Sequence, residues 1–482
     1  MNVMSDISVT AEFEIDPEYN FAGGNGSAED PYQINTSGGL QNIGFYPNAH
    51  FVLTADIILP EVGECESNFT PLLSDETMFG GTLDGQGHKI VNLTVYNTET
   101  FYSGLFSCIG SSGSVTNLTL ENASVSGSNY IGGIAGHALG AVTDCTVTGK
   151  ITYVCNNSNK VFAGGIAGRA EASVDGCVTD VTITIEDAQA ETNAGGIVGY
   201  LSYGGSASAP LKLTTHGSIT VSSSGDVYAG GLVGYSSGSL YLSASQATGE
   251  VLSMSTSGTF SHAGGLVGDG YTVTVTDSYA TGNVTSTGTS THSHAGGLVG
   301  DGYTVTVTDS YATGDVTSTG TSNSSCVGGL VGDGSTVTVT DSYATGNVTS
   351  VSRYGSYIGG LVGYSNDVTV RNFYSVSCVS AEIENGNVYI GGLAGYVGGS
   401  LTLENAHWYG GEGTAAEYAV GYSDSLGIPT SIGSTRHNAV EEFYTLADTL
   451  NAGREEPVWE HKGEGTLPTL IEKTQENEEE TL

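Results

Sequence analysis

A glycine pair followed by an apolar residue and a third glycine recurs nine times through the middle of this chain. Each copy reads Gly-Gly-(Leu/Ile)-(Val/Ala)-Gly, and the first glycines stand at positions 132, 164, 195, 230, 264, 296, 328, 359 and 391. Successive copies lie 31 to 35 residues apart. A fixed period of this size is typical of solenoids, propellers and arrays, in which each repeat buries its apolar face against its neighbours. The chain is therefore predicted to form one repetitive body.

Three consecutive repeats are almost identical and indicate β-structure. The segment TVTVTDSYATG occurs at 272–282, 304–314 and 336–346. Its alternation of polar and apolar residues and its content of Thr, Val and Tyr are typical of half-buried strands. Leucines recur at one phase and valines at another, and we expect them to form two columns of the core: Leu266, Leu298, Leu330 and Leu361, and Val273, Val305 and Val337. These features predict an all-β solenoid with parallel strands.

Four regions are predicted along the chain. Residues 1–100 are expected to form an N-terminal strand, over 5–15 where apolar residues alternate, and a cap that leads into the first coil. The repeats occupy 101–427. A C-terminal cap over 428–471 is expected to contain one helix at 439–450, with Asn438 as N-cap and Glu441 at the capping-box position. The acidic residues 472–482 are predicted to be disordered.

Charge and hydropathy exclude some classes of partner. The net charge is −40 with only 11 Lys and Arg, so the chain should repel phosphate backbones, and nucleic-acid binding is not expected. No run of 18 apolar residues exists, so membrane insertion is not expected. No signal peptide is visible, yet the composition is that of an exported protein. We expect a mature or excised piece of a longer product, located outside the cell or on its surface.

The seven cysteines do not predict a disulfide scaffold, since an odd number leaves at least one thiol unpaired. Cys145 and Cys177 occupy the slot that serines 278, 310 and 342 fill in later repeats. We interpret them as inward-facing small apolar residues. A disulfide between these two stacked neighbours is the alternative.

The repeats resemble those of the GLUG-motif proteins, a family of bacterial and archaeal surface or secreted proteins. The likeness lies in the Gly-Gly-Leu-Val-Gly segments, in GSAEDPYQI (26–34) and GTLDGQGHKI (81–90) near the start, and in LADTLN (446–451) and GTLPTL (465–470) near the end. It spans roughly residues 23–471. The resemblance implies a right-handed β-helix, here of about ten to twelve coils with an N-terminal cap and a small α/β C-terminal cap. It implies no shared catalytic residues.

One activity found beside such repeats can be checked against the histidines. Some bacterial immunoglobulin proteases of this kind carry a zinc protease domain, which needs His-Glu-x-x-His on a helix. The ten histidines here include no such pair. This chain could therefore represent only the repeat part of such an enzyme.

A row of aspartates is the candidate metal site. Asp269, Asp301 and Asp333 follow the glycine motif at one phase, so in-register stacking would bring three like charges together. A cation would relieve this repulsion, and ligands that are all oxygen favour Ca²⁺ over a transition metal. No other cofactor is expected. The alternative is that these aspartates are solvated turn residues.

A row of tyrosines is the candidate ligand site. Tyr279, Tyr311, Tyr343 and Tyr374 recur at intervals of 32, 32 and 31 residues. Exposed aromatic rows can stack on sugar rings, whereas buried ones only stabilise contacts between strands. Both interpretations of the tyrosines stay open.

These features favour a protein that is not an enzyme. Lys and Arg are absent from 213–352, so no basic cluster there could stabilise an oxyanion or a uronate. We predict a non-catalytic cell-surface or secreted β-helix that acts as an adhesin-like binding module or stalk. Its expected partner is a host or microbial surface glycan or protein. The alternatives are a polysaccharide-active β-helix enzyme, a lyase or glycosidase, and a purely structural spacer.

Overall fold

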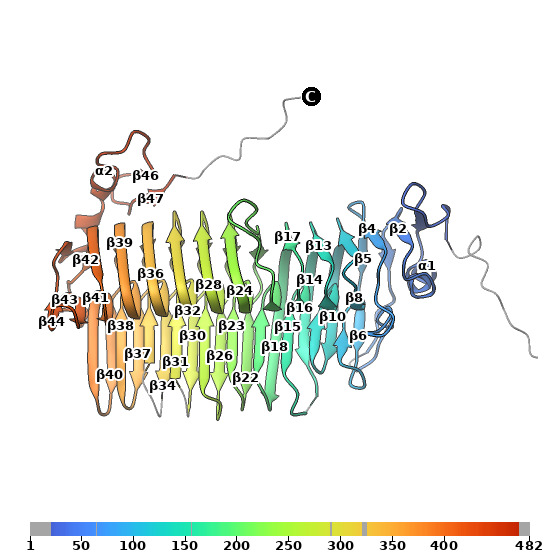
Figure 1. Ribbon diagram of the computed structural model, residues 1–482, viewed down its shortest axis with the longest axis horizontal. Helices are drawn as coiled ribbons and strands as arrows, with labels where there is room; N and C mark the ends of the chain where they lie inside the picture. The colour runs from blue at the N-terminus through green and yellow to red at the C-terminus, as the bar shows by residue number, and fades with distance from the viewer. Residues whose placement is uncertain (1–20, 64, 156, 290–291, 321–324, 472–482) are drawn as a thin grey trace, which may run out of the picture.

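The computed structural model describes residues 21–63, 65–155, 157–289, 292–320 and 325–471, and these form one elongated β-solenoid (Figure 1). The solenoid has about 12 turns, and nearly all of its strand pairs are parallel. The prediction of an all-β parallel solenoid is therefore confirmed. The strand predicted at 5–15 and the tail at 472–482 lie outside the described residues.

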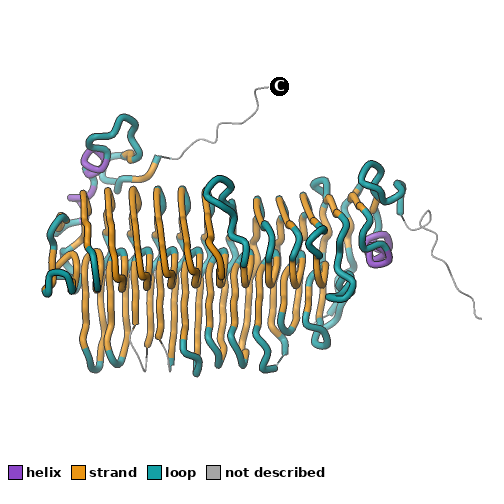
Figure 2. The backbone as a smooth tube through the Cα atoms, in the orientation of Figure 1, coloured by secondary structure: helices purple, strands orange, loops and turns teal. Residues whose placement is uncertain are grey.

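Each coil of the repeat region contains three main strands. In one coil these are β27 (Phe260–Gly264), β28 (Val267–Thr276) and β30 (Val284–Gly288). Each strand pairs with its counterpart in the next coil, and Val267 lies opposite Val299 without a shift of register. Figure 2 shows the same strands repeated along the body. Equal repeat lengths therefore place equivalent residues one above the other.

The interior is a set of columns of like residues. The predicted leucine and valine columns are fully buried, which confirms both. Cys145 and Cys177 are buried free thiols, so the prediction of inward-facing cysteines is also confirmed. Ser278 fills the same slot and donates its hydroxyl hydrogen to the carbonyl of Thr276, 2.7 Å away, which satisfies the buried polar group.

The glycine pair forms the corner between two strands of a coil, where backbone segments approach too closely for a side chain. A Cβ placed on Gly296 would lie 1.9 Å from the carbonyl oxygen of Val299. A Cβ on Gly297 would lie 2.0 Å from the carbonyl oxygen of Gly329 in the next coil. Both distances are far below van der Waals contact. The motif therefore recurs because every coil needs this corner.

The N-terminal end is closed by a short helix that was not predicted. Parallel pairing begins with β1 (Tyr32–Ile34) and β2 (His50–Leu53). Between them lies α1 (Ser37–Asn42), whose N-cap Thr36 accepts a hydrogen bond from the amide of Gly39. Leu40, in this helix, is fully buried. Two glycines in α1 and its short length hid the helical period from sequence analysis.

Parallel pairing also continues beyond residue 427 at the other end. β43 (Tyr418–Ser423) pairs with β41 (Asn387–Val397), and β45 (Ser434–His437) pairs with β42 (Leu401–Tyr409). An antiparallel strand, β44 (Ile428–Thr430), returns along β43. These strands cover the last coil.

The single helix predicted at 439–450 is wrong. The segment forms a 3-10 turn, η3 (Val440–Phe443), and a separate short helix, α2 (Leu446–Leu450). Ala439 rather than Asn438 is the N-cap, and the capping carboxylate belongs to Glu442 rather than Glu441, since its Oε1 accepts from the amide of Ala439. Phe443 of the turn packs in one cluster with Leu446, Ala447 and Leu450 of the helix.

The C-terminal cap lies on a side of the solenoid rather than across its end (Figure 1). A two-stranded hairpin, β46 (Trp459–Glu460) with β47 (Thr469–Leu470), follows α2. Trp459 packs against Tyr343 and Tyr374 of the repeat region. An ion pair between Arg454 and Asp341 joins the cap to the same side. The hairpin of the cap therefore covers a side of the repeats and does not close the end of the solenoid.

One buried histidine gives the last coils a dependence on pH. His407 lies in β42, with Nδ1 3.0 Å from Nε2 of His437 and Nε2 2.9 Å from Oδ1 of Asn405. Burial, and after it the neighbouring His437, lowers the pKa of His407 from the ordinary 6.5 to about 4. The folded state therefore keeps this imidazole neutral.

We predict that Gly296→Ala destabilises the solenoid by about 1–3 kcal/mol, because the new methyl group must displace backbone at the corner. Gly44→Ala is the matched control, since a Cβ at Gly44 would meet no atom within 4 Å. The midpoint of thermal unfolding, followed by circular dichroism, measures both. Equal midpoints for the two variants would contradict the steric role of the motif.

We also predict that His407 weakens the fold in acid. Its pKa is lower in the folded than in the unfolded state, so its contribution is complete above pH ~6.5 and is lost as the pH falls towards ~4. Between pH 7 and 4.5 the wild type should lose about 2 kcal/mol more unfolding free energy than His407→Gln. Denaturant titrations at both pH values measure this. The exposed His216→Gln should behave as the wild type, and an equal loss in His407→Gln would refute the assignment.

Candidate functional site

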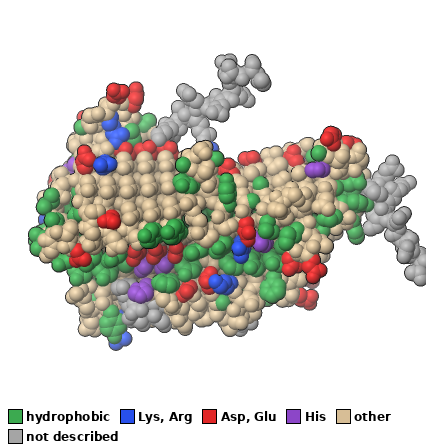
Figure 3. Space-filling view, in the orientation of Figure 1, with side chains coloured by type: hydrophobic (Ala, Val, Ile, Leu, Met, Phe, Trp, Pro, Cys, Tyr) green, Lys and Arg blue, Asp and Glu red, His purple; other side chains and the backbone are tan. Residues whose placement is uncertain are grey.

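The three aspartates predicted as a ladder do lie in register. Asp269 belongs to β28, Asp301 to β32 (Val299–Thr308) and Asp333 to β36 (Val331–Ala344), and each faces the next in the pairing. All three lie inside strands, so the alternative that they are turn residues is wrong. Figure 3 shows acidic side chains in a row that borders histidines on the face in view.

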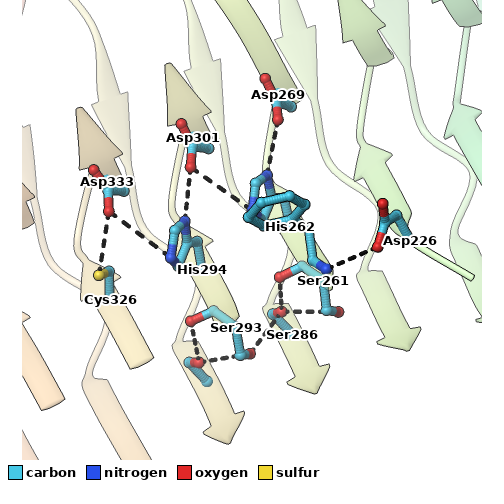
Figure 4. A network of polar contacts seen from close by, with 12 residues as sticks. Asp226, Ser261, His262, Asp269, Ser286, Ser293, His294, Asp301, Cys326 and Asp333 are labelled. Atoms are coloured by element: carbon cyan, nitrogen blue, oxygen red, sulfur yellow. Dashed lines mark hydrogen bonds and ion pairs between the residues drawn. The ribbon is translucent and has the colours of Figure 1, made fainter. Parts of the chain in front are cut away.

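A column of nitrogen and sulfur donors runs beside the aspartates. His262 lies in β27, His294 in β31 (His292–Gly296) and Cys326 in β35 (Ser325–Gly328). Each precedes the aspartate of its own coil by 7 residues, and the glycine corner between the two strands turns them towards one another (Figure 4). We call these six residues the Asp–His–Cys ladder. Sequence reasoning missed its second column, although the constant offset was a visible signal.

The contacts of the ladder repeat from coil to coil. Nδ1 of His262 lies 2.9 Å from Oδ2 of Asp269, and Nδ1 of His294 lies 2.7 Å from Oδ2 of Asp301. The Nε2 atoms face the aspartate of the following coil, 3.7 Å from Asp301 for His262 and 3.8 Å from Asp333 for His294. The two imidazole rings stack with centroids 4.6 Å apart. Each carboxylate is therefore set against imidazole nitrogen rather than against another carboxylate.

Burial and neighbouring charges shift the titration of the ladder. Burial raises the pKa of Asp269 and Asp333, whereas at Asp301 the effect of burial is outweighed by the two imidazoles, which lower its pKa. Burial opposes the charged form of His294, but Cys326 and the facing aspartates raise its pKa well above the ordinary value. Burial also raises the pKa of the Cys326 thiol to about 12. The thiol is protonated at neutral pH, so a Cys-His nucleophile is not supported.

The predicted tyrosine row forms a second candidate site. The rings of Tyr279, Tyr311, Tyr343 and Tyr374 stack with centroid separations of 4.9, 4.7 and 5.1 Å. The C-terminal cap buries the later members: Tyr343 is 6% exposed and Tyr374 is 0% exposed. The hydroxyl of Tyr374 donates to the carbonyl of Pro468 in the cap, 2.6 Å away. Tyr374 is therefore inaccessible, and the prediction that it binds a ligand is corrected, whereas Tyr343 still lines the groove between the tyrosine row and the cap.

A groove remains between the exposed end of the tyrosine row and the cap. Its volume is about 640 Å³, within the range of small-molecule sites. Tyr279 and Tyr311 line the solenoid side together with Gln246, Asp277 and Asp309. Lys462, Val458 and Leu470 line the side of the cap. Sequence reasoning could not find this groove, because its second wall comes from a segment more than a hundred residues away.

Comparisons with known proteins agree with the repeat pattern. The profile of the GLUG motif matches residues 127–152. Halomucin of Haloquadratum walsbyi is 37% identical over 139 residues, which are 27% of this chain and 2% of that protein. A protein of Evansella cellulosilytica named as a Gly-rich membrane protein is 32% identical over 133 residues, which are 26% of this chain and 15% of that protein. The chain thus spans only a small part of either relative.

A search of solved structures gives a weaker likeness. It finds a Bacteroides ovatus crystal structure whose name assigns it as an immunoglobulin A1 protease, with 15% identity and a TM-score of 0.25 over 94% of this chain and 96% of that one. A score of this size carries no argument about function.

No helix among the described residues is long and apolar enough to cross a membrane. The chain is a parallel β-solenoid, and its segment at residues 127–152 matches the GLUG motif.

Proposed function

We propose that this chain is a non-catalytic binding module of a surface or secreted protein, and that the groove beneath the C-terminal cap takes a neutral glycan. The observation that carries the proposal is the end of the tyrosine row. Gln246 rather than an aromatic residue holds the register position before Tyr279, so Tyr279 is the first ring of the stack. The hydroxyl of Tyr279 donates to Oε1 of Gln246, and a sugar ring can pack against these two side chains together where they face the groove.

The polar residues of the groove suit a neutral sugar. Asp277, Asp309 and Gln246 make the wall that holds the tyrosines polar. The net charge of −40 disfavours uronates and sulfated glycans. Asp277 and Asp309 have positive φ values of 49° at equivalent turns of adjacent coils. They therefore hold equivalent positions on one wall of the groove. The two carboxyl groups of a glycosidase instead lie on either side of the bond that is cleaved.

Location outside the cell is supported by the relatives and by composition. One relative is named as a membrane protein. A solenoid with few charged residues and a long polar surface suits a stalk that holds a binding site away from its anchor. The glycan site and the stalk are then parts of one function.

We predict binding of neutral oligosaccharides on a glycan array, confirmed by calorimetry. Tyr279→Ala should weaken binding about tenfold, because it removes the first ring of the stack. Tyr271→Ala is the matched control: Tyr271 stacks on Tyr303 with centroids 5.2 Å apart, but it is exposed and does not line the groove.

Each other result identifies a different function. Loss of binding in Tyr271→Ala alone would move the site out of the groove. Release of shorter sugars, detected by mass spectrometry, would make the chain a polysaccharide-active enzyme acting through Asp277 and Asp309. Binding to no glycan on the array would favour a structural spacer.

A further inference from the structure

The Asp–His–Cys ladder replaces aromatic pairs that fill the same slots in neighbouring coils. Tyr228 and Tyr357 lie opposite His262 and Cys326 in the strand pairing. On the adjacent strand, Tyr235 and Tyr364 lie opposite Asp269 and Asp333. The tyrosines of each flanking coil contact one another, with centroids 5.3 and 5.2 Å apart. Pairs of tyrosines can therefore fill these two positions of a coil. Three successive coils carry aspartate with histidine or cysteine there instead, which are residue types that bind metals.

One end of the ladder has the donor spacing of a tetrahedral metal site. Nε2 of His294 and Oδ2 of Asp333 are 3.8 Å apart, and Sγ of Cys326 is 3.4 Å from the same oxygen. All three donor atoms lie within 4.8 Å of one another. Bond lengths of zinc to nitrogen, oxygen and sulfur at tetrahedral angles place such ligands about 3.3–3.6 Å apart. The two distances to Oδ2 of Asp333 therefore differ from this range by a few tenths of an ångström at most.

The imidazole of His294 is oriented for this task. Its Nδ1 lies 2.7 Å from Oδ2 of Asp301, so an Nδ1 hydrogen donated to this carboxylate leaves Nε2 facing Cys326 and Asp333. A carboxylate behind a ligating histidine is the usual arrangement at metal sites in proteins. Asp301 is thus a positioning residue for His294.

The ladder also contains a buried nitrogen that belongs to a second, neighbouring group of possible ligands. Nε2 of His262 is buried, in a side chain that is 3% exposed, and it makes no hydrogen bond. It faces Oδ2 of Asp301 at 3.7 Å, and these two atoms and a nitrogen of His294 form a second group of possible ligands (Figure 4). A buried polar nitrogen without a partner is uncommon, because it loses its hydrogen bonds to water and gains none in the protein.

An ion can reach the ladder from solvent. The carboxylates form its outer edge, and the side chain of Asp333 is partly accessible to solvent, with 24% exposed. His294 and Cys326 lie behind it and are buried. The protein thus supplies nitrogen and sulfur from inside and oxygen from the surface.

We propose that the ladder binds one zinc ion through Nε2 of His294, Sγ of Cys326 and Oδ2 of Asp333. Water completes the tetrahedron, and the protons displaced from the ligands pass to solvent. The ion joins two adjacent coils, since His294 and Cys326 belong to successive repeats. Calcium was expected from the aspartates alone, but the nitrogen and sulfur donors favour a borderline ion such as Zn²⁺ over one that takes six to eight oxygens.

Two measurements on the full chain test the proposal. Zn²⁺ added to metal-free protein should raise the midpoint of thermal unfolding, whereas millimolar Ca²⁺ should not. Co²⁺, as a spectroscopic substitute, should give a sulfur-to-metal charge-transfer band in the near ultraviolet. Calcium stabilisation without a zinc effect, or a cobalt complex without this band, would overturn the proposal.

Variants locate the ion. Cys326→Ser should abolish the cobalt band, while Cys177→Ser should keep it, since serine fills the Cys177 slot in other coils. Asp301→Asn should weaken zinc binding about 10- to 100-fold but keep the band, as a positioning residue should. His262→Gln should change neither the affinity for zinc nor the cobalt band. A band that survives Cys326→Ser in protein with native circular dichroism, or one lost in His262→Gln, would refute the assigned ligands.

Discussion

Every feature of this protein depends on the parallel hydrogen bonding of one coil to the next at a constant register. At the glycine corner, the amide of Leu266 donates to the carbonyl of Leu298, and the amide of Leu298 donates to that of Leu330, each at 2.8 Å. The corner brings backbone within contact of backbone, as the 1.9 Å clash of a Cβ at Gly296 shows. Without that close approach, successive coils could not keep the same path.

Constant register turns each repeat position into a column whose members must tolerate one another. Leucine and valine columns gain from stacking because they bury apolar area. Stacked carboxylates repel one another, and the imidazoles of the Asp–His–Cys ladder reduce this repulsion because they lie between the carboxylates. The ladder spans three coils, and the column returns to aromatic residues at Tyr235 and Tyr364 on either side.

Polar columns also run through the interior, where each hydroxyl needs a partner. Ser286 donates to the carbonyl of Ser261 at 2.7 Å (Figure 4). Ser318 donates to the carbonyl of Ser293 at 2.9 Å. The hydroxyl of Ser293 in turn donates to Ser286, which links the coils. A shift of register by one residue would leave these buried hydroxyls without partners, so the serines favour the observed alignment.

The sequence by itself determined the solenoid, its core columns and the row of aspartates, because a strict period is written along the chain and needs no long-range information. Only the tertiary structure decided what lies beside each column. His262 joins Asp269 because the glycine corner turns one strand against the next, and the path of that corner is not encoded in spacing alone. Tyr343 and Tyr374 are buried because the cap, whose helix is broken at Tyr444 and Thr445, folds back on the side of the solenoid. Docking of this kind depends on the fit of two surfaces that are distant in sequence, so a periodic pattern cannot predict it.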